Sequence, residues 1–256
     1  MSTHANIDAH GHDAHGAAHD PYLAHHFEDI DQQSESHALG LWIFLATEIM
    51  FFGGLFLAFI VYHILFSDAF GIASSRLSVV WGVINTAVLL ISSFTMAMAV
   101  HSAQTNKRKP LLVYLGITFL CACAFMGIKS IEWTEKAHHH LIPGPAFHFD
   151  LNDPTAAETK ASNWPERREA ILARDPQVEK HAEMFYVMYF SLTGLHGFHV
   201  LCGMGVIAWI FKRAYQGEFN SQWNTPVELT GLYWHLVDLI WIYLFPVIYL
   251  VHRIQH

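Results

Sequence analysis

Charge is scarce in this sequence. Of its 256 residues, 14% are charged and 53% are hydrophobic, whereas a typical soluble domain carries about 25% charge. The net charge of -8 offers no basic face, which excludes nucleic acid as a partner. Cysteine is also rare. Cys121, Cys123 and Cys202 all lie in apolar runs, which predicts buried free thiols and no disulfide framework of the secreted kind.

Lysine and arginine are absent from residues 1–37, and an apolar run is missing there too. The segment instead holds eight histidines: His4, His10, His12, His15, His19, His25, His26 and His37. Because its low hydrophobicity cannot offset the entropy of ordering, we expect a disordered polar tail over 1–37. The irregular histidine spacing specifies no metal geometry, so a solvated, titratable tail is favoured over a metal-binding one. Residues 38–256 form the predicted membrane domain.

Five apolar runs are long enough to cross a bilayer, which takes about 20 helical residues. They lie at about Leu39–Leu65, Leu77–Val100, Leu111–Trp133, Met184–Phe211 and Val227–Val251. None shows the alternation typical of a strand, and backbone groups in hydrocarbon must satisfy one another. The sequence therefore predicts an all-α, polytopic membrane protein with five transmembrane helices in a bundle.

Basic residues in the short connections predict the orientation. The side shared by the N-terminus and the second and fourth loops holds Lys107, Arg108, Lys109, Lys212 and Arg213. The positive-inside rule therefore predicts a cytoplasmic N-terminus and a C-terminus outside. The loop at about 134–183 would then face outward, with a short surface helix from Asn163 to about Arg174. At the last helix, Thr225, Pro226 and Glu228 predict a capping box.

Glu48 is the sharpest polar candidate. It lies about 14 Å inside the first run at 1.5 Å per residue, close to the predicted midplane. A carboxylate there must be protonated, paired, or in contact with water inside the protein. Two interpretations stay open: a structural carboxylic acid at a helix interface, and a group that handles protons.

Further polar residues lie in the other runs. His196 and His199 are three residues apart, as are His235 and Asp238, and Glu132 lies at the outer end of the third run. Each spacing places both members on one helical face. Carboxylates and imidazoles across a bundle are the ligand types of a dimetal site, but neither Glu-x-x-His nor His-x-x-x-His occurs within these five runs. An interhelical polar network without metal is therefore the favoured interpretation.

These motifs resemble cytochrome c oxidase subunit III. The fifth run, Glu228-x-x-Gly231-x-Tyr-Trp-His235-x-Val-Asp238-x-x-Trp241, is similar to the last helix of that family, and Thr193-Gly-Leu-His196-Gly-Phe-His199 to its penultimate helix. Glu48 before Phe51-Phe52-Gly53 resembles the family's third helix and its intramembrane carboxylate. Asn85-Thr86 with Ser92-Ser93 resembles the fourth helix, and Glu132 falls at the end of the fifth.

The resemblance implies an accessory core subunit of an aerobic respiratory cytochrome c oxidase in a bacterial cytoplasmic membrane. Such a subunit packs beside subunit I, supports proton uptake and the stability of the complex, and has no catalytic residue or redox centre of its own. Haem and copper would belong to partner subunits. Subunit I, subunit II and phospholipid are the implied partners, and Glu228 would contact its own helix end or a neighbouring chain.

Two departures from the family pattern qualify this expectation. The match starts at the third family helix, so a complete lipid cleft would need the first two helices from another chain. The outward loop at 134–183 is longer than the family's usual connection. This loop could contact a neighbouring subunit or a cytochrome, or be only a solvated insertion. Since Trp164 begins an amphipathic stretch, a subunit contact is favoured.

Three alternatives remain at this point. The first is a stand-alone proton-coupled transporter that uses Glu48, His235 and Asp238 as a relay; it is disfavoured because no internal repeat is visible. The second is a membrane dimetal enzyme. The third is a subunit III relative that serves a quinol oxidase or a nitric oxide reductase.

Overall fold

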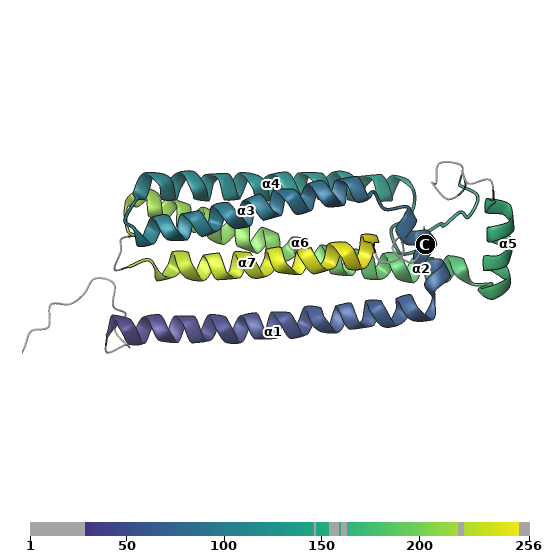
Figure 1. The fold of residues 1–256 in the computed structure, drawn as a ribbon, viewed down its shortest axis with the longest axis horizontal. Coiled ribbons are helices and arrows are strands. Elements are labelled where there is room, and N and C mark those ends of the chain that lie inside the picture. Colours follow the sequence, from purple (N-terminus) through teal and green to yellow (C-terminus); the bar gives the residue numbers. More distant parts are fainter. Residues whose placement is uncertain (1–28, 146, 154–158, 160–162, 220–222, 251–256) are drawn as a thin grey trace, which may run out of the picture.

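The computed structural model describes residues 29–145, 147–153, 159, 163–219 and 223–250. Four long antiparallel helices form a bundle, and a fifth long helix lies along one side of it (Figure 1). The elements are α1 (Ile30–Leu65), α2 (Ser67–Ser75), α3 (Val79–Gln104), α4 (Arg108–His138), α5 (Trp164–Arg174), α6 (Val178–Gln216), α7 (Thr225–Phe245) and the π-helical turn η2 (Pro246–Leu250).

The prediction of five membrane-spanning helices is confirmed. Among the described residues, α1, α3, α4, α6 and α7 with η2 are long and apolar enough to cross a membrane. The boundary predicted for the polar tail is too late, because α1 begins at Ile30 and His37 is helical. Asp29 caps this helix by accepting a hydrogen bond from the backbone of Gln32. The predicted disorder of residues 1–28 concerns a segment outside the described residues.

The core lies between α3, α4, α6 and α7. Its largest fully buried side chains include Trp234 and Trp241 of α7. By contrast, only 17% of the most apolar stretch of α1 is buried. This helix contacts α7, α6 and α2 and directs most of its apolar residues outward. In a protein of this kind, such residues face lipid or another chain.

Two short helices, α2 and α5, lie at the end of the bundle opposite the start of α1 (Figure 1). α2, which the sequence did not reveal, is almost entirely buried, and its Phe70 packs edge-on to Phe59 of α1 and Phe185 of α6. The predicted surface helix is confirmed as α5. Its Trp164 is only 5% exposed and belongs to the chain's own core, so the expectation that Trp164 offers a partner contact is wrong.

Two smaller predictions also need correction. The capping box at the last helix does not form, because Asn224 is the N-cap residue and Thr225 is the first helical one. The Thr225 hydroxyl lies 3.2 Å from that of Ser34 on α1 instead. The cysteines are free as expected, but Cys123 and Cys202 are exposed on helix surfaces. A helix that is apolar on all sides does not reveal from its sequence which side is buried.

Close helix packing depends on Gly203 of α6. A Cβ atom at this position would lie 2.7 Å from Cζ3 of Trp234, so α6 and α7 approach through the missing side chain. We expect Gly203→Ala to destabilise the bundle by about 1–3 kcal/mol through overpacking. A Cβ atom added to Gly205, on the same helix, would meet nothing within 4 Å, so Gly205→Ala is the matched control. Thermal unfolding in detergent measures the difference, and equal stability of the two variants would contradict the prediction.

Candidate functional site: buried polar groups between the helices

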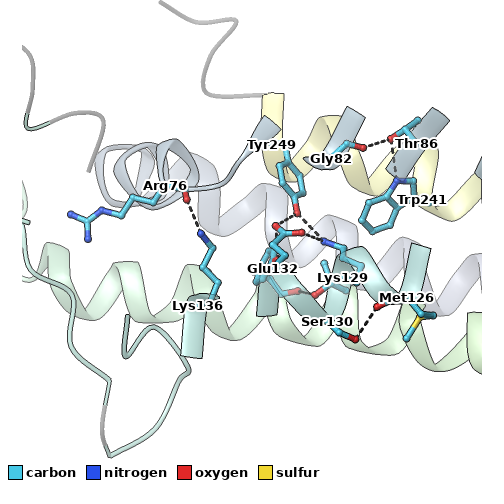
Figure 2. Close-up of polar contacts among 12 residues, drawn as sticks. Arg76, Gly82, Thr86, Met126, Lys129, Ser130, Glu132, Lys136, Trp241 and Tyr249 are labelled. Carbon is cyan, nitrogen blue, oxygen red and sulfur yellow. Dashed lines mark hydrogen bonds and ion pairs between the residues drawn. The ribbon is translucent and has the colours of Figure 1, made fainter. Parts of the chain in front are cut away.

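A buried ion pair lies between α4 and its neighbours, toward the end of the bundle where α2 lies. Lys129 and Glu132 are one turn apart on α4, and the Lys129 Nζ atom is 2.7 Å from Glu132 Oε2 (Figure 2). The two residues are only 5% and 2% exposed. Because a charge buried alone is strongly unfavourable, each of these side chains requires the other.

Two tyrosines complete the cluster around the ion pair. Tyr249 donates a hydrogen bond of 2.6 Å to Glu132 Oε1 and accepts one of 2.9 Å from Lys129 Nζ. Tyr189 of α6 donates a third bond, of 3.0 Å, to Glu132 Oε1. The carboxylate thus accepts from one ammonium and two hydroxyl groups. We refer to Lys129, Glu132, Tyr189 and Tyr249 as the outer polar cluster.

The π-helical turn η2 places Tyr249 in this cluster. Pro246 interrupts the backbone hydrogen bonds of α7, and the chain continues as a wider turn over Pro246–Leu250. Ile248 and Tyr249 are both buried there. The outer polar cluster therefore connects three elements: α4, α6 and the end of the last helix.

Aromatic rings enclose the ammonium group of Lys129. Its Nζ atom lies 4.8 Å from the ring centroid of Trp241, within the range of a cation–π contact. The Trp241 indole donates to the Thr86 hydroxyl on α3 at 3.1 Å, which brings the fourth bundle helix into the arrangement (Figure 2). Further along α4, Lys136 donates to the backbone carbonyl of Arg76 at 2.8 Å, which ties α4 to the end of α2.

Glu48 lies at a different place, the seam between α1 and α6. Its Oε2 atom is 3.0 Å from His199 Nε2, and the two side chains are 17% and 14% exposed. This separation is that of an ion pair, although the two groups are not aligned as a hydrogen bond. The other ring nitrogen, His199 Nδ1, is 2.7 Å from the backbone oxygen of Leu195. The structure thus gives Glu48 a partner that the sequence did not specify.

The remaining predicted residues do not form one continuous network. His196 is fully buried between the rings of Phe125 and Trp241, and neither of its nitrogens has a hydrogen-bond partner in the described chain. The expectation that His196 joins helices by polar contacts is therefore wrong. Glu228 accepts from Gln104 of α3 at 2.7 Å rather than closing the capping box of its own helix.

His235 and Asp238 do not pair with each other as expected. His235 Nδ1 is 2.8 Å from the Ser93 hydroxyl of α3. Asp238 is 2% exposed, and Ser93 is its polar neighbour, but neither of its oxygens makes a hydrogen bond of normal geometry within the described residues. Both residues therefore face α3, since α7 packs against that helix.

Metal ligation has no geometric support in the part of the chain that the structure describes. No three His, Cys, Asp or Glu side chains come together there in a way that could hold a metal ion. The carboxylates instead take ammonium, hydroxyl, amide or imidazole partners, as described for Glu132, Glu228 and Glu48. The geometry is that of a polytopic helical membrane protein whose buried polar groups join helices to one another.

Comparison with known proteins shows which family this helical bundle is similar to. Residues 180–252 match the family model described as cytochrome c oxidase subunit III. The chain is 28% identical to a cytochrome bo(3) ubiquinol oxidase subunit 3 from Pseudomonas aeruginosa, over 98% of this chain and 99% of that protein. It is 29% identical to a quinol oxidase subunit 3 from Bacillus subtilis, over 87% of this chain and 92% of the other.

A cytochrome c oxidase subunit 3 from Alkalihalophilus pseudofirmus is similar to the same extent. It is 27% identical over 90% of this chain and 93% of its own length. Over most of its length the chain is similar to members of the haem–copper oxidase subunit III family. The resemblance inferred from the motifs is thereby confirmed, and the match extends over nearly the full length of these relatives.

The residues that sequence reasoning missed are Lys129, Tyr189 and Tyr249. A signal for Lys129 was present, because a lysine inside an apolar run and one turn before Glu132 suggests an ion pair. The tyrosines gave no such signal. They lie 57 and 117 residues from Glu132 along the chain and meet it only through the helix packing.

The ion pair predicts a characteristic pattern of stability. Lys129→Met leaves the Glu132 carboxylate buried without its counter-charge, so we expect a loss of about 3–5 kcal/mol in the free energy of unfolding. The double variant Lys129→Met/Glu132→Gln removes both charges and should regain most of that loss. Arg174→Gln breaks the exposed pair with Asp68 and should cost about 1 kcal/mol or less. Denaturation of the purified variants measures all three, and a double variant no more stable than Lys129→Met contradicts the expectation.

Proposed function

We propose that this protein is an accessory, non-catalytic subunit of a haem–copper terminal oxidase in a bacterial cytoplasmic membrane. The observation that carries the proposal is the near full-length similarity to oxidase subunits 3. Five apolar helices long enough to span a membrane agree with it. In this proposal subunit I is the main contact, subunit II is a further neighbour, and haem and copper are held by those partners.

The proposal leaves the electron donor open. The relatives include ubiquinol, quinol and cytochrome c oxidases by name, at similar identity. A subunit whose buried polar groups are used to join its own helices does not contact the donor through them. The narrower expectation of a cytochrome c oxidase therefore stays a prediction, as do bound phospholipid and the cytoplasmic location of the N-terminus.

In the proposed assembly, α1 is the helix that suits contact with a partner. It exposes large apolar side chains along most of its length, including Leu39, Trp42, Ile49, Met50 and Leu57. Glu48 lies on the same helix, on the side that contacts α6. A partner packed on the outer face of α1 would shelter the seam that contains Glu48 from lipid.

Co-purification tests the proposal directly. A tag on this chain, used to isolate it from native membranes in mild detergent, should bring down a haem-containing subunit with oxygen-reducing activity. The activity with reduced cytochrome c and with a quinol then identifies the donor. A tagged polytopic protein from the same membrane, unrelated in sequence, controls for carry-over. Isolation of a homogeneous chain without haem would overturn the proposal.

Glu48 provides a second test, which concerns its role within the complex. Glu48→Gln preserves the shape of the side chain and its capacity for hydrogen bonding, so assembly and the initial rate of oxygen reduction should stay close to wild type. A proton-handling role predicts slower proton uptake or faster loss of activity during turnover. Glu228→Gln is the matched control, because that carboxylate lies at the helix end beside Gln104. Wild-type proton uptake and endurance in Glu48→Gln would assign the carboxyl a structural role.

A further inference from the structure

We propose that Asp238 keeps a proton inside the bundle and that this proton, acting through Ser93, makes His235 a hydrogen-bond donor on the flank between α3 and α7. The proposal goes beyond the proposed function, because it concerns the state of this chain's own residues and does not depend on the electron donor. It starts from the burial of Asp238, which is 2% exposed, and from the 2.8 Å separation of the Ser93 hydroxyl and His235 Nδ1.

Asp238 lies in the interior without a partner for its charge. It belongs to the buried face of α7, together with Trp234 and Trp241. Neither of its carboxyl oxygens makes a hydrogen bond of normal geometry within the described residues, and the polar side chain beside it is that of Ser93 on α3. A hydroxyl group carries no charge, so it cannot neutralise a carboxylate. An ionised Asp238 would therefore be an isolated charge within hydrocarbon, which is strongly unfavourable.

The titratable groups on neighbouring helices do not supply the missing counter-charge. On α4, Lys129 is held in the outer polar cluster. On α6, His196 is enclosed by aromatic rings and makes no hydrogen bond within the described chain, and His199 lies beside Glu48 of α1. Asp238 therefore becomes neutral by carrying a proton, which converts the carboxylate into a carboxylic acid.

The acid proton gives the neighbouring hydrogen bonds a direction. A carboxylic acid has one O–H donor, and Ser93 is the polar side chain that can accept from it. The Ser93 hydroxyl then directs its own hydrogen to His235 Nδ1. A ring nitrogen that accepts a hydrogen bond carries no hydrogen, so the neutral imidazole must carry its hydrogen on Nε2. The chain of donors thus runs from Asp238 through Ser93 to His235.

Loss of this proton would reverse the chain. A carboxylate can only accept, so Ser93 would turn its hydrogen toward Asp238 and present an oxygen lone pair to His235 Nδ1. The imidazole hydrogen would then have to lie on Nδ1, which leaves only a lone pair on Nε2. The protonation of the buried acid therefore decides whether His235 Nε2 is a donor or an acceptor.

His235 presents this nitrogen at the side of the bundle. The imidazole and Ser93 are only partly buried, whereas Asp238 is buried. Leu232 and Leu239 share the helical face of His235 and are 38% and 50% exposed. A donor on such an apolar face within a membrane is satisfied by an oxygen acceptor on a neighbouring helix. The partner that fits this flank is therefore a membrane-spanning helix with a carbonyl, hydroxyl or carboxylate oxygen at the depth of His235.

Infrared spectroscopy and nitrogen NMR test the two halves of the proposal. The complete complex is reconstituted in vesicles, with aspartate labelled at its side-chain carboxyl carbon and histidine labelled at its ring nitrogens. At neutral pH the wild type should show a band of a protonated aspartate carboxyl that is lost in Asp238→Asn. The nitrogen shifts should place the hydrogen of His235 on Nε2, and His235→Gln identifies the signals of that ring.

Three variants make the test specific. Ser93→Ala should shift the acid band, because the acid loses its acceptor, and His235 should no longer hold a single tautomer. Asp238→Asn should keep the hydrogen on Nε2, since its amide also donates to Ser93. Ser191→Ala is the matched control, because that exposed hydroxyl bonds to its own helix, and it should leave both signals unchanged.

Two outcomes overturn the proposal. One is the absence of a protonated aspartate band that responds to Asp238→Asn or to Ser93→Ala, and the other is a hydrogen on His235 Nδ1 in the wild type. Both readouts are spectroscopic and need no electron transfer. Their failure is therefore distinct from a failure of this chain to co-purify with a haem-containing subunit.

Discussion

Charge inside hydrocarbon constrains this molecule more than any other factor. An isolated ionised side chain in the membrane is costly, so each one needs a partner that the fold brings to it. Glu132 has Lys129 and two tyrosine hydroxyl groups, and Glu48 has His199. The helices therefore have to be positioned so that these paired side chains meet and so that the helix surfaces fit together. In lipid, where apolar burial does not draw helices together, such contacts and close packing decide the arrangement.

The two carboxylates play different parts because their surroundings differ. Glu132 is enclosed by three helical segments and accepts three hydrogen bonds from an ammonium and two hydroxyl groups. Because the Glu132 carboxylate has all three of these partners, the arrangement suits a permanent connection between the helices. Glu48 has one partner, at a seam with a lightly packed helix. This contact joins α1 to α6 at one point, whereas the outer polar cluster joins α4 to two neighbouring segments.

Similarity to the subunit III family gives these contacts a context. Among the described residues, the buried polar side chains join helices to one another, and no three His, Cys, Asp or Glu side chains are placed to hold a metal ion. The outer polar cluster and the buried helix α2 fix one end of the bundle. Helix α1 differs from these elements, because its exposed apolar surface suits contact with a partner. The fold thus divides into a firmly joined four-helix part and a peripheral helix.

The sequence by itself determined the class of the molecule. The lengths of the apolar runs required five membrane-spanning helices, because a single segment in hydrocarbon satisfies its own backbone hydrogen bonds only as a helix. The order of the motifs indicated the family. The sequence also identified Glu48 as an acid inside the first membrane-spanning run and Glu132 as an acid at the end of the third. Only the tertiary structure decided their partners: His199 rather than a metal for Glu48, Tyr189 and Tyr249 for Glu132, and aromatic rings alone for His196. The physical reason is that these partners come from different helices. When a helix is apolar on all sides, its sequence does not state which face it turns toward its neighbours.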